Sequence, residues 1–327
     1  MAAGFACGGG GEKEEAEPTL QLLLGTPAPV NPSFAGSEDG GEGVDGGPLA
    51  SHEPQLVSLD WLEQPVDVPP LPAFAVRTED AGLLATVQEA LKDGLGRSSV
   101  VIHNLADGRY VAINESEVYY GASLYKMSVL LEVFKQADAG ELDLSEVVTL
   151  EEEYAENDIE TLELLGLEVG DTLTIGDAVK AMIIVSDTST AVLLQETVGG
   201  RNADDTLREL GIEDTSFNNR ALSATAADMA VLMEAVASGR GVSEGSRLRM
   251  LQLLLQEGYK DGVAAGAPEG TAIAHKTGSY NDATHDVALV WGPAGPYVIS
   301  VMTDQPNNWP LVAKVSTAVW DYFAANP

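Results

Sequence analysis

The chain has 327 residues, 45% of them hydrophobic, which is enough for one large or two ordinary domains with a sizeable core. Its 51 Asp and Glu residues against 17 Lys and Arg give a formal net charge of -34. This charge disfavours nucleic acids and anionic membrane surfaces as partners, because like charges repel. Cys7 is the only cysteine, so no intramolecular disulfide can form.

The first predicted unit, residues 1–72, is an acidic tail or linker rich in Gly and Pro. Such a composition buries too little apolar surface to offset the entropy lost on ordering. Apolar side chains in residues 56–62 can dock locally, but the pattern assigns no element there. No complete signal peptide is present. Ala6-Cys7 and the glycines after it resemble the cut end of a bacterial lipoprotein, which makes Cys7 a candidate lipid anchor.

The second predicted unit, residues 73–327, is a globular domain with strands towards both ends. Apolar spacing predicts helices, and short β-rich runs predict strands. The expected helices cover 79–91, 174–184, 188–198, 203–210, 225–237, 246–256 and 309–325, and the expected strands cover 98–105, 109–114, 271–278, 286–291 and 297–303. This order predicts an α/β (α+β) domain with one antiparallel sheet built from both ends of the chain. A helical lobe is inserted in the middle, and a crevice between the lobes is a natural active site. The acidic run at 151–153 is interpreted as a solvated face or a loop.

Ser123 and Lys126 form an S-x-x-K pair at the start of an apolar helical run. Three residues of separation place both side chains on one helix face. A serine hydroxyl needs an adjacent base when it attacks, and a lysine can be that base if burial or a nearby cation lowers its pKa. The pair alone is a weak signal, because a lone S-x-x-K is more often a helix cap with a surface lysine.

Two further motifs follow in order. Ser186-Asp187-Thr188 lies between two predicted helices, and Lys276-Thr277-Gly278 lies on a predicted strand. The ordered triple resembles the superfamily of penicillin-binding proteins and class A β-lactamases, from about Leu83 to the C-terminus. The resemblance implies a β-lactamase/transpeptidase-like fold, with a five-stranded antiparallel sheet flanked by helices and an all-helical lobe.

The resemblance also implies roles for the four expected catalytic residues. Ser123 would attack a carbonyl carbon with Lys126 as its base. Ser186 would relay a proton to the leaving nitrogen. The ammonium of Lys276 would help to keep Lys126 neutral by like-charge repulsion.

Four more residues are expected to bind the substrate. Lys276 and Thr277 would bind a substrate carboxylate, and Gly278 would leave room for substrate along the strand edge. The backbone N–H groups of Ser123 and Ser279 would form the oxyanion hole. Thr188 stands where the family usually has Asn, so its grip on the substrate's amide side chain differs. Asp187 is expected to point inward and hold its loop.

One family feature is absent. Class A β-lactamases carry a glutamate in a loop after the helical lobe, and this glutamate activates the deacylating water. The corresponding stretch, residues 215–223, contains no acid, and Glu213 and Asp214 just before it do not match the motif. We therefore expect acylation to be more secure than fast hydrolysis.

The sequence predicts a serine hydrolase that forms an acyl-enzyme on Ser123, with a β-lactam or a related amide as its small-molecule substrate. One alternative is a penicillin-binding-protein-like D-alanyl carboxypeptidase or esterase. Another is a sensor domain that binds β-lactams without turnover. No metal or organic cofactor is implied, since the spacing of His275, His285 and Asp286 fits no zinc pattern. Family habit predicts a monomer outside the cytoplasm.

Overall fold

The computed structural model describes residues 54–92, 94, 96–217 and 222–327. Its main feature is a six-stranded sheet in the order β1-β3-β2-β10-β9-β8. The strands are β1 (Thr78–Glu79), β2 (Ser98–Asn104), β3 (Arg109–Ile113), β8 (Ile273–Tyr280), β9 (Ala283–Gly292) and β10 (Gly295–Thr303). The five predicted antiparallel strands are confirmed. The sixth strand, β1, was not predicted; it is a two-residue strand that pairs parallel with β3.

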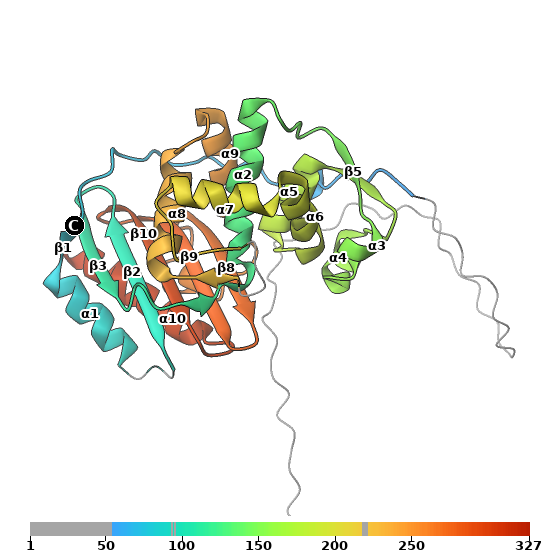
Figure 1. Ribbon diagram of the computed structural model, residues 1–327. Helices are drawn as coiled ribbons and strands as arrows, with labels where there is room; N and C mark the ends of the chain where they lie inside the picture. The colour runs from blue at the N-terminus through green and yellow to red at the C-terminus, as the bar shows by residue number, and fades with distance from the viewer. Residues whose placement is uncertain (1–53, 93, 95, 218–221) are drawn as a thin grey trace, which may run out of the picture.

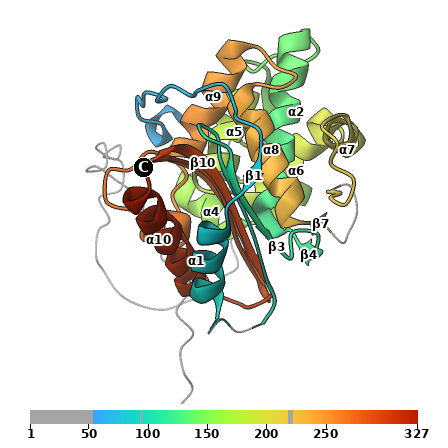
Figure 2. The same cartoon turned by 90° about the vertical axis from the view of Figure 1, so that its left-hand side faces the viewer.

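Helices cover both faces of the sheet (Figure 2). One face carries α1 (Ala81–Leu91) and α10 (Trp309–Ala325), and the other carries α2 (Tyr125–Ala139), α8 (Ala226–Ser238) and α9 (Glu244–Leu255). Alternation along β2 explains both layers, because successive side chains of a strand point to opposite faces. Val100 and Ile102 belong to the core under α1 and α10, whereas Val101 belongs to the core shared with the helical lobe.

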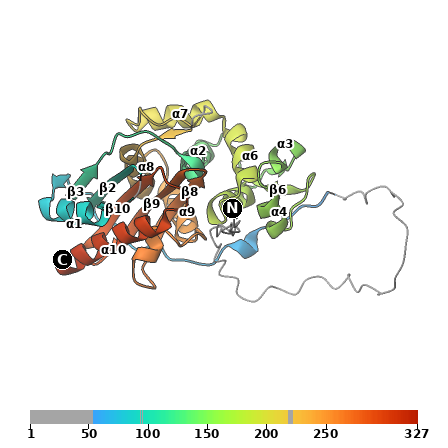
Figure 3. The ribbon, with the colours of Figure 1, turned by 90° about the horizontal axis from the view of Figure 1, so that it is seen from below.

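The helical lobe lies at the end of the sheet away from α1 (Figures 1 and 3). It contains α3 (Glu152–Ala155), α4 (Ile159–Leu165), α5 (Ile175–Ile184) and α6 (Thr188–Val198), with a small hairpin of β5 (Val147–Thr149) and β6 (Thr172–Thr174). The next helix, α7 (Gly200–Glu209), packs against α2 and α6. Side-chain caps begin the two helices that flank the second motif. Thr174 accepts from the N–H of Asp177 at the start of α5, and Asp187 does the same for Thr190 in α6. The acidic run at 151–153 forms a solvated face, which was one of its two interpretations, because its three side chains are exposed and Glu152 begins the short helix α3.

The predicted tail needs a correction at its end. Residues 54–72, which we call the strap, lie against the folded domain, and the rest of the predicted tail, with Cys7, lies outside the described residues. Leu59 is fully buried and Leu62 nearly so, and the backbone N–H of Val57 donates to Thr172 O of β6 at 2.8 Å. The local docking expected for residues 56–62 therefore occurs, and these few apolar anchors reach a core that the rest of the chain provides.

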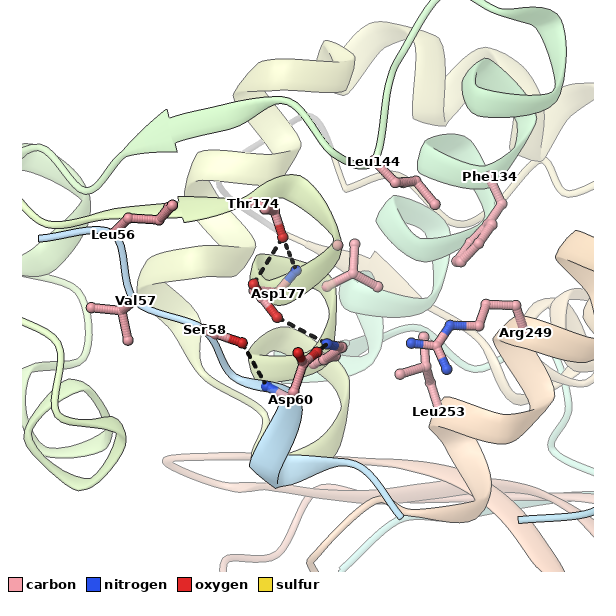
Figure 4. Close-up of a pocket in the computed structure, with 13 residues that line it drawn as sticks. Leu56, Val57, Ser58, Asp60, Phe134, Leu144, Thr174, Asp177, Arg249 and Leu253 are labelled. Atoms are coloured by element: carbon pink, nitrogen blue, oxygen red, sulfur yellow. Dashed lines mark hydrogen bonds and ion pairs between the residues drawn. The ribbon is translucent and has the colours of Figure 1, made fainter. Parts of the chain in front are cut away.

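Two ion pairs also fasten the strap. Asp60 of the short helix η1 (Asp60–Leu62) accepts from Lys180 Nζ of α5 at 2.6 Å, and Glu63 binds Arg249 of α9. Figure 4 shows Asp60 and Asp177 in a cavity of about 490 Å³ between the strap, α2, α5 and α9. The strap therefore ties α5 to α9, the two helices that end beside the second and third motifs. No helix in the described part of the chain has the length and apolar character needed to cross a membrane.

Candidate active site

The first motif lies on a tight turn. Ser123 is half-buried in the short helix η2 (Ala122–Leu124), directly before α2. Ala122 has a φ of +46°, a conformation that costs a non-glycine residue about 1–3 kcal/mol and is typical of functional sites. The N–H of Gly121 donates to Leu222 O at 2.6 Å, and β4 (Tyr119–Tyr120) pairs with β7 (Ser223–Ala224). These contacts hold the strained turn in place.

His285 supports the same turn from the sheet. Its Nε2 lies 2.8 Å from the carbonyl oxygen of Tyr120, and Thr303 N donates to its Nδ1 at 3.2 Å. Nε2 must therefore carry the proton, and the ring is neutral. Burial lowers the pKa of His285 to about 4, which agrees with a neutral ring. His285 therefore has a structural role at this turn.

Lys126 is fully buried one turn after Ser123. Its Nζ donates to the carbonyl oxygen of Ser186, lies 3.2 Å from Ser186 Oγ, and lies 3.3 Å from Thr188 Oγ1. Burial and, second, the charge of Lys276 lower the pKa of Lys126 to about 7. A substantial fraction of this amine is therefore unprotonated at neutral pH, which is the form that can accept a proton.

The second motif lies between α5 and α6. Ser186 has a φ of +57°, so it is a second strained non-glycine residue at the site after Ala122. Asp187 is fully buried and accepts from both N and Oγ1 of Thr190 at 2.6 Å, so it points inward as expected. The N–H of Thr188 donates to Oδ2 of Asp158 at 3.0 Å. The loop is thus held from both sides, with the Ser186 and Thr188 hydroxyls directed at Lys126.

The third motif lies on the edge strand β8. Gly278 packs directly on the turn that carries Ser123, because a Cβ added to it would lie 3.0 Å from Gly121 O and 3.1 Å from Leu124 Cγ. A side chain here would separate the strand from the turn. Ser279 follows at the exposed end of the strand, and Tyr280 packs against Tyr120 with ring centroids 5.5 Å apart.

Lys276 and Thr277 have a partner that sequence reasoning missed. Lys276 Nζ lies 3.2 Å from Oε1 of Glu257, and Thr277 Oγ1 donates to the same oxygen at 2.6 Å. Glu257 lies two residues after the end of α9 and is fully buried. The structure therefore joins Lys126 to Ser186 and Thr188, and it joins Lys276 and Thr277 to Glu257.

Sequence comparison decides the family. The model of the beta-lactamase enzyme family matches residues 83–323. The chain belongs to this family.

Three known proteins are similar to the chain over most of its length. Beta-lactamase L2 of Stenotrophomonas maltophilia is 26% identical over 249 residues, which are 70% of this chain and 80% of L2. The crystal structure of a β-lactamase from Sphaerobacter thermophilus is 25% identical, with a TM-score of 0.66, over 76% of this chain and 98% of that one. The structure of PBP-A has a TM-score of 0.71 at 24% identity, over 77% of this chain and 99% of that one. The predicted superfamily and its fold are confirmed.

This beta-lactamase family member differs from the class A pattern in its deacylation loop. Residues 218–221 of that loop lie outside the described residues. The described flank is held by Asp204, which accepts from Phe217 N at 2.9 Å and from Ser216 Oγ at 2.6 Å. Asp204 therefore anchors this flank of the loop through one backbone and one side-chain hydrogen bond. Among the described residues no cluster of three or more His, Cys, Asp or Glu side chains could hold a metal ion.

Proposed function

We propose that this beta-lactamase-like serine hydrolase forms an acyl-enzyme on Ser123 with a β-lactam or a related amide. The observation that carries the proposal is the buried amine of Lys126, whose pKa is lowered to about 7 beside the Ser186 loop and one turn from Ser123. An ordinary lysine would be charged at neutral pH and could not accept the serine proton. The shared family supports the same reaction type.

The proposed reaction has two proton steps. The Ser123 oxygen bonds to the amide carbon as its proton moves to Lys126, and the developing oxyanion is stabilised by the backbone N–H groups of Ser123 and Ser279. The C–N bond then breaks, and the proton passes through the Ser186 hydroxyl to the leaving nitrogen. The contact between Lys126 Nζ and Ser186 Oγ at 3.2 Å supports this relay.

The lack of an acid in residues 215–223 favours a second candidate, a β-lactam-binding sensor or transpeptidase-like protein that is acylated without rapid turnover. PBP-A provides a parallel, because a mutant of that protein has been solved as an acyl-enzyme complex with penicillin G. A D-alanyl carboxypeptidase or esterase uses the same acylation step. All three candidates form the acyl-enzyme on Ser123, and they differ only in how fast and to which acceptor the acyl group is then transferred.

One experiment separates them. The purified protein is mixed with a chromogenic cephalosporin, and absorbance and intact mass are followed together. Steady turnover supports hydrolysis, a single stable adduct supports the sensor or transpeptidase-like function, and the absence of both refutes the β-lactam assignment. Ser123→Ala should abolish the adduct. Ser128→Ala is a matched control, because Ser128 Oγ donates only locally to Tyr125 O at 2.7 Å.

We also propose that the protein acts outside the cytoplasm as a monomer and that Cys7 carries a lipid. The sequence around Cys7 and the habit of the family support this location. Metabolic labelling with a radioactive fatty acid tests the anchor, and a Cys7→Ser variant should lose both the label and membrane sedimentation. Unlabelled Cys7 in a host with lipoprotein processing would refute the anchor.

A further inference from the structure

The two groups expected to bind a substrate carboxylate already bind a carboxylate of the protein. Thr277 Oγ1 donates to Glu257 Oε1 at 2.6 Å, and the backbone N–H of Thr277 points to the same oxygen at 3.4 Å. A hydroxyl has one proton to donate, so Thr277 has none left for a substrate anion. Lys276 Nζ uses two of its three protons on Glu257 Oε1, at 3.2 Å, and on Thr277 O, at 3.0 Å.

Glu257 is itself fixed in place. Its Oε2 accepts from Tyr259 N at 2.9 Å and lies 3.3 Å from Nε2 of His275, and the side chain is fully buried. The N–H of Gly258, next in the chain, donates to Ile184 O at the end of α5 at 2.8 Å. The carboxylate therefore cannot swing aside without breaking several of these contacts.

The charge of this carboxylate persists despite burial. Burial alone would raise the pKa of Glu257, but the neighbouring Lys276 and His275 lower it below its ordinary value. An ionised Glu257 cancels most of the attraction that Lys276 would exert on a second anion, because the paired charges lie 3.2 Å apart. Glu257 thus offsets the positive charge of Lys276 within the protein.

We propose that Glu257 determines substrate specificity: it fills the anion-binding position of the Lys276-Thr277-Gly278 strand, so that the enzyme prefers substrates with a neutral group where others carry a carboxylate. This inference rests on the proposed acylation of Ser123. The substrate class is amides or esters whose group beside the scissile bond is uncharged, such as an ester or a carboxamide. A substrate carboxylate would meet Glu257 across Lys276 and be repelled.

The test compares benzylpenicillin with its methyl ester, which differ only at that group: a carboxylate in the acid and an uncharged methyl ester in its derivative. Second-order rate constants for adduct formation on Ser123 are measured by rapid quench and intact mass. The wild type should acylate with the acid no more than about threefold faster than with the ester. Glu257→Gln removes the charge and retains the shape, and it should shift the acid-to-ester ratio at least tenfold towards the acid, which is about 1.4 kcal/mol. General damage to the site slows both compounds and leaves the ratio unchanged.

Glu269→Gln is the matched control, because Glu269 is exposed in the same connection between α9 and β8 and should leave the ratio as in the wild type. A wild-type preference for the acid of a hundredfold, or an unchanged ratio in a folded Glu257→Gln variant, overturns the inference and leaves the proposed function standing. If Glu257→Gln does not fold, the wild-type ratio decides. The absence of any adduct with both compounds overturns the proposed function, and the inference with it.

Discussion

Replacing Lys126 with Met should stabilise the fold while it abolishes acylation. Lys126 lies on α2 and its side chain is fully buried in the protein. Methionine has a similar length and carries no charge. Burial and the nearby Lys276 lower the pKa of Lys126 from 10.5 to about 7, so between these pH values the unfolded chain binds a proton that the folded chain does not. The contribution of Lys126 to the free energy of unfolding therefore becomes less unfavourable as the pH rises from about 7 to 10.5.

The size of the effect follows from the two pKa values. Each pH unit is worth about 1.36 kcal/mol, so burying the Lys126 amine costs folding about 4 kcal/mol at pH 7 and about 2 kcal/mol at pH 9. The variant escapes this cost but leaves its partners on the Ser186 loop without a donor, which costs about 1–3 kcal/mol at both pH values. Because this loss is the same at pH 7 and pH 9, it drops out when the stability differences at the two pH values are compared. The stability advantage of Lys126→Met over wild type should thus shrink by about 2 kcal/mol from pH 7 to pH 9.

Urea unfolding followed by circular dichroism at pH 7, 8 and 9 measures this advantage. Lys92→Met provides the control, because the Lys92 side chain is 65% exposed and its removal should have the same effect at each pH. A Lys126→Met advantage that is constant between pH 7 and pH 9 would refute the reasoning, since it would mean that Lys126 keeps its proton in the folded protein.

Three further outcomes are expected. The rate of Ser123 acylation should rise with pH through a midpoint near 7, as Lys126 loses its proton, and stopped-flow rates that are flat from pH 5.5 to 8.5 would contradict this. Gly278→Ala should slow acylation at least tenfold and destabilise the fold by about 1–3 kcal/mol. Gly245→Ala on α9, where the added Cβ would meet only Ser243 Oγ at an ordinary 3.8 Å, should stabilise the fold by up to about 1 kcal/mol in the same urea assay. Leu59→Ala should cost about 2–5 kcal/mol, because the fully buried side chain leaves a cavity under the strap, and an unchanged urea midpoint would show that the strap does not contribute to stability.

The regular elements could be predicted because each carries its own periodic signal. The closing helix was predicted at 309–325 and found as α10 (Trp309–Ala325), and the three C-terminal strands were found within a few residues of their predicted ends. The three motifs could also be placed on their elements from the sequence: the first lies at the start of a helix, the second lies in a loop between two helices, and the third lies on a strand.

Features that depend on partners distant in the chain could not be predicted. Glu257 is a single acid after a helix, with no motif around it, and only the folded chain brings it within 3.2 Å of Lys276. The left-handed backbone of Ala122 and Ser186 is likewise unexpected for these residue types and is imposed by the contacts around them. Leu59 gave only a weak local signal, because the core that buries it is built from later parts of the chain.

The pairing of β2 with β10 has a consequence for biogenesis. Val100 of one strand lies opposite Val301 of the other, about two hundred residues later in synthesis. The sheet therefore cannot close until its last strand, β10, has left the ribosome, and such non-local pairing makes folding slow. Nascent chains will expose the apolar faces of β2 and α2 during this wait, which makes them natural clients for chaperones.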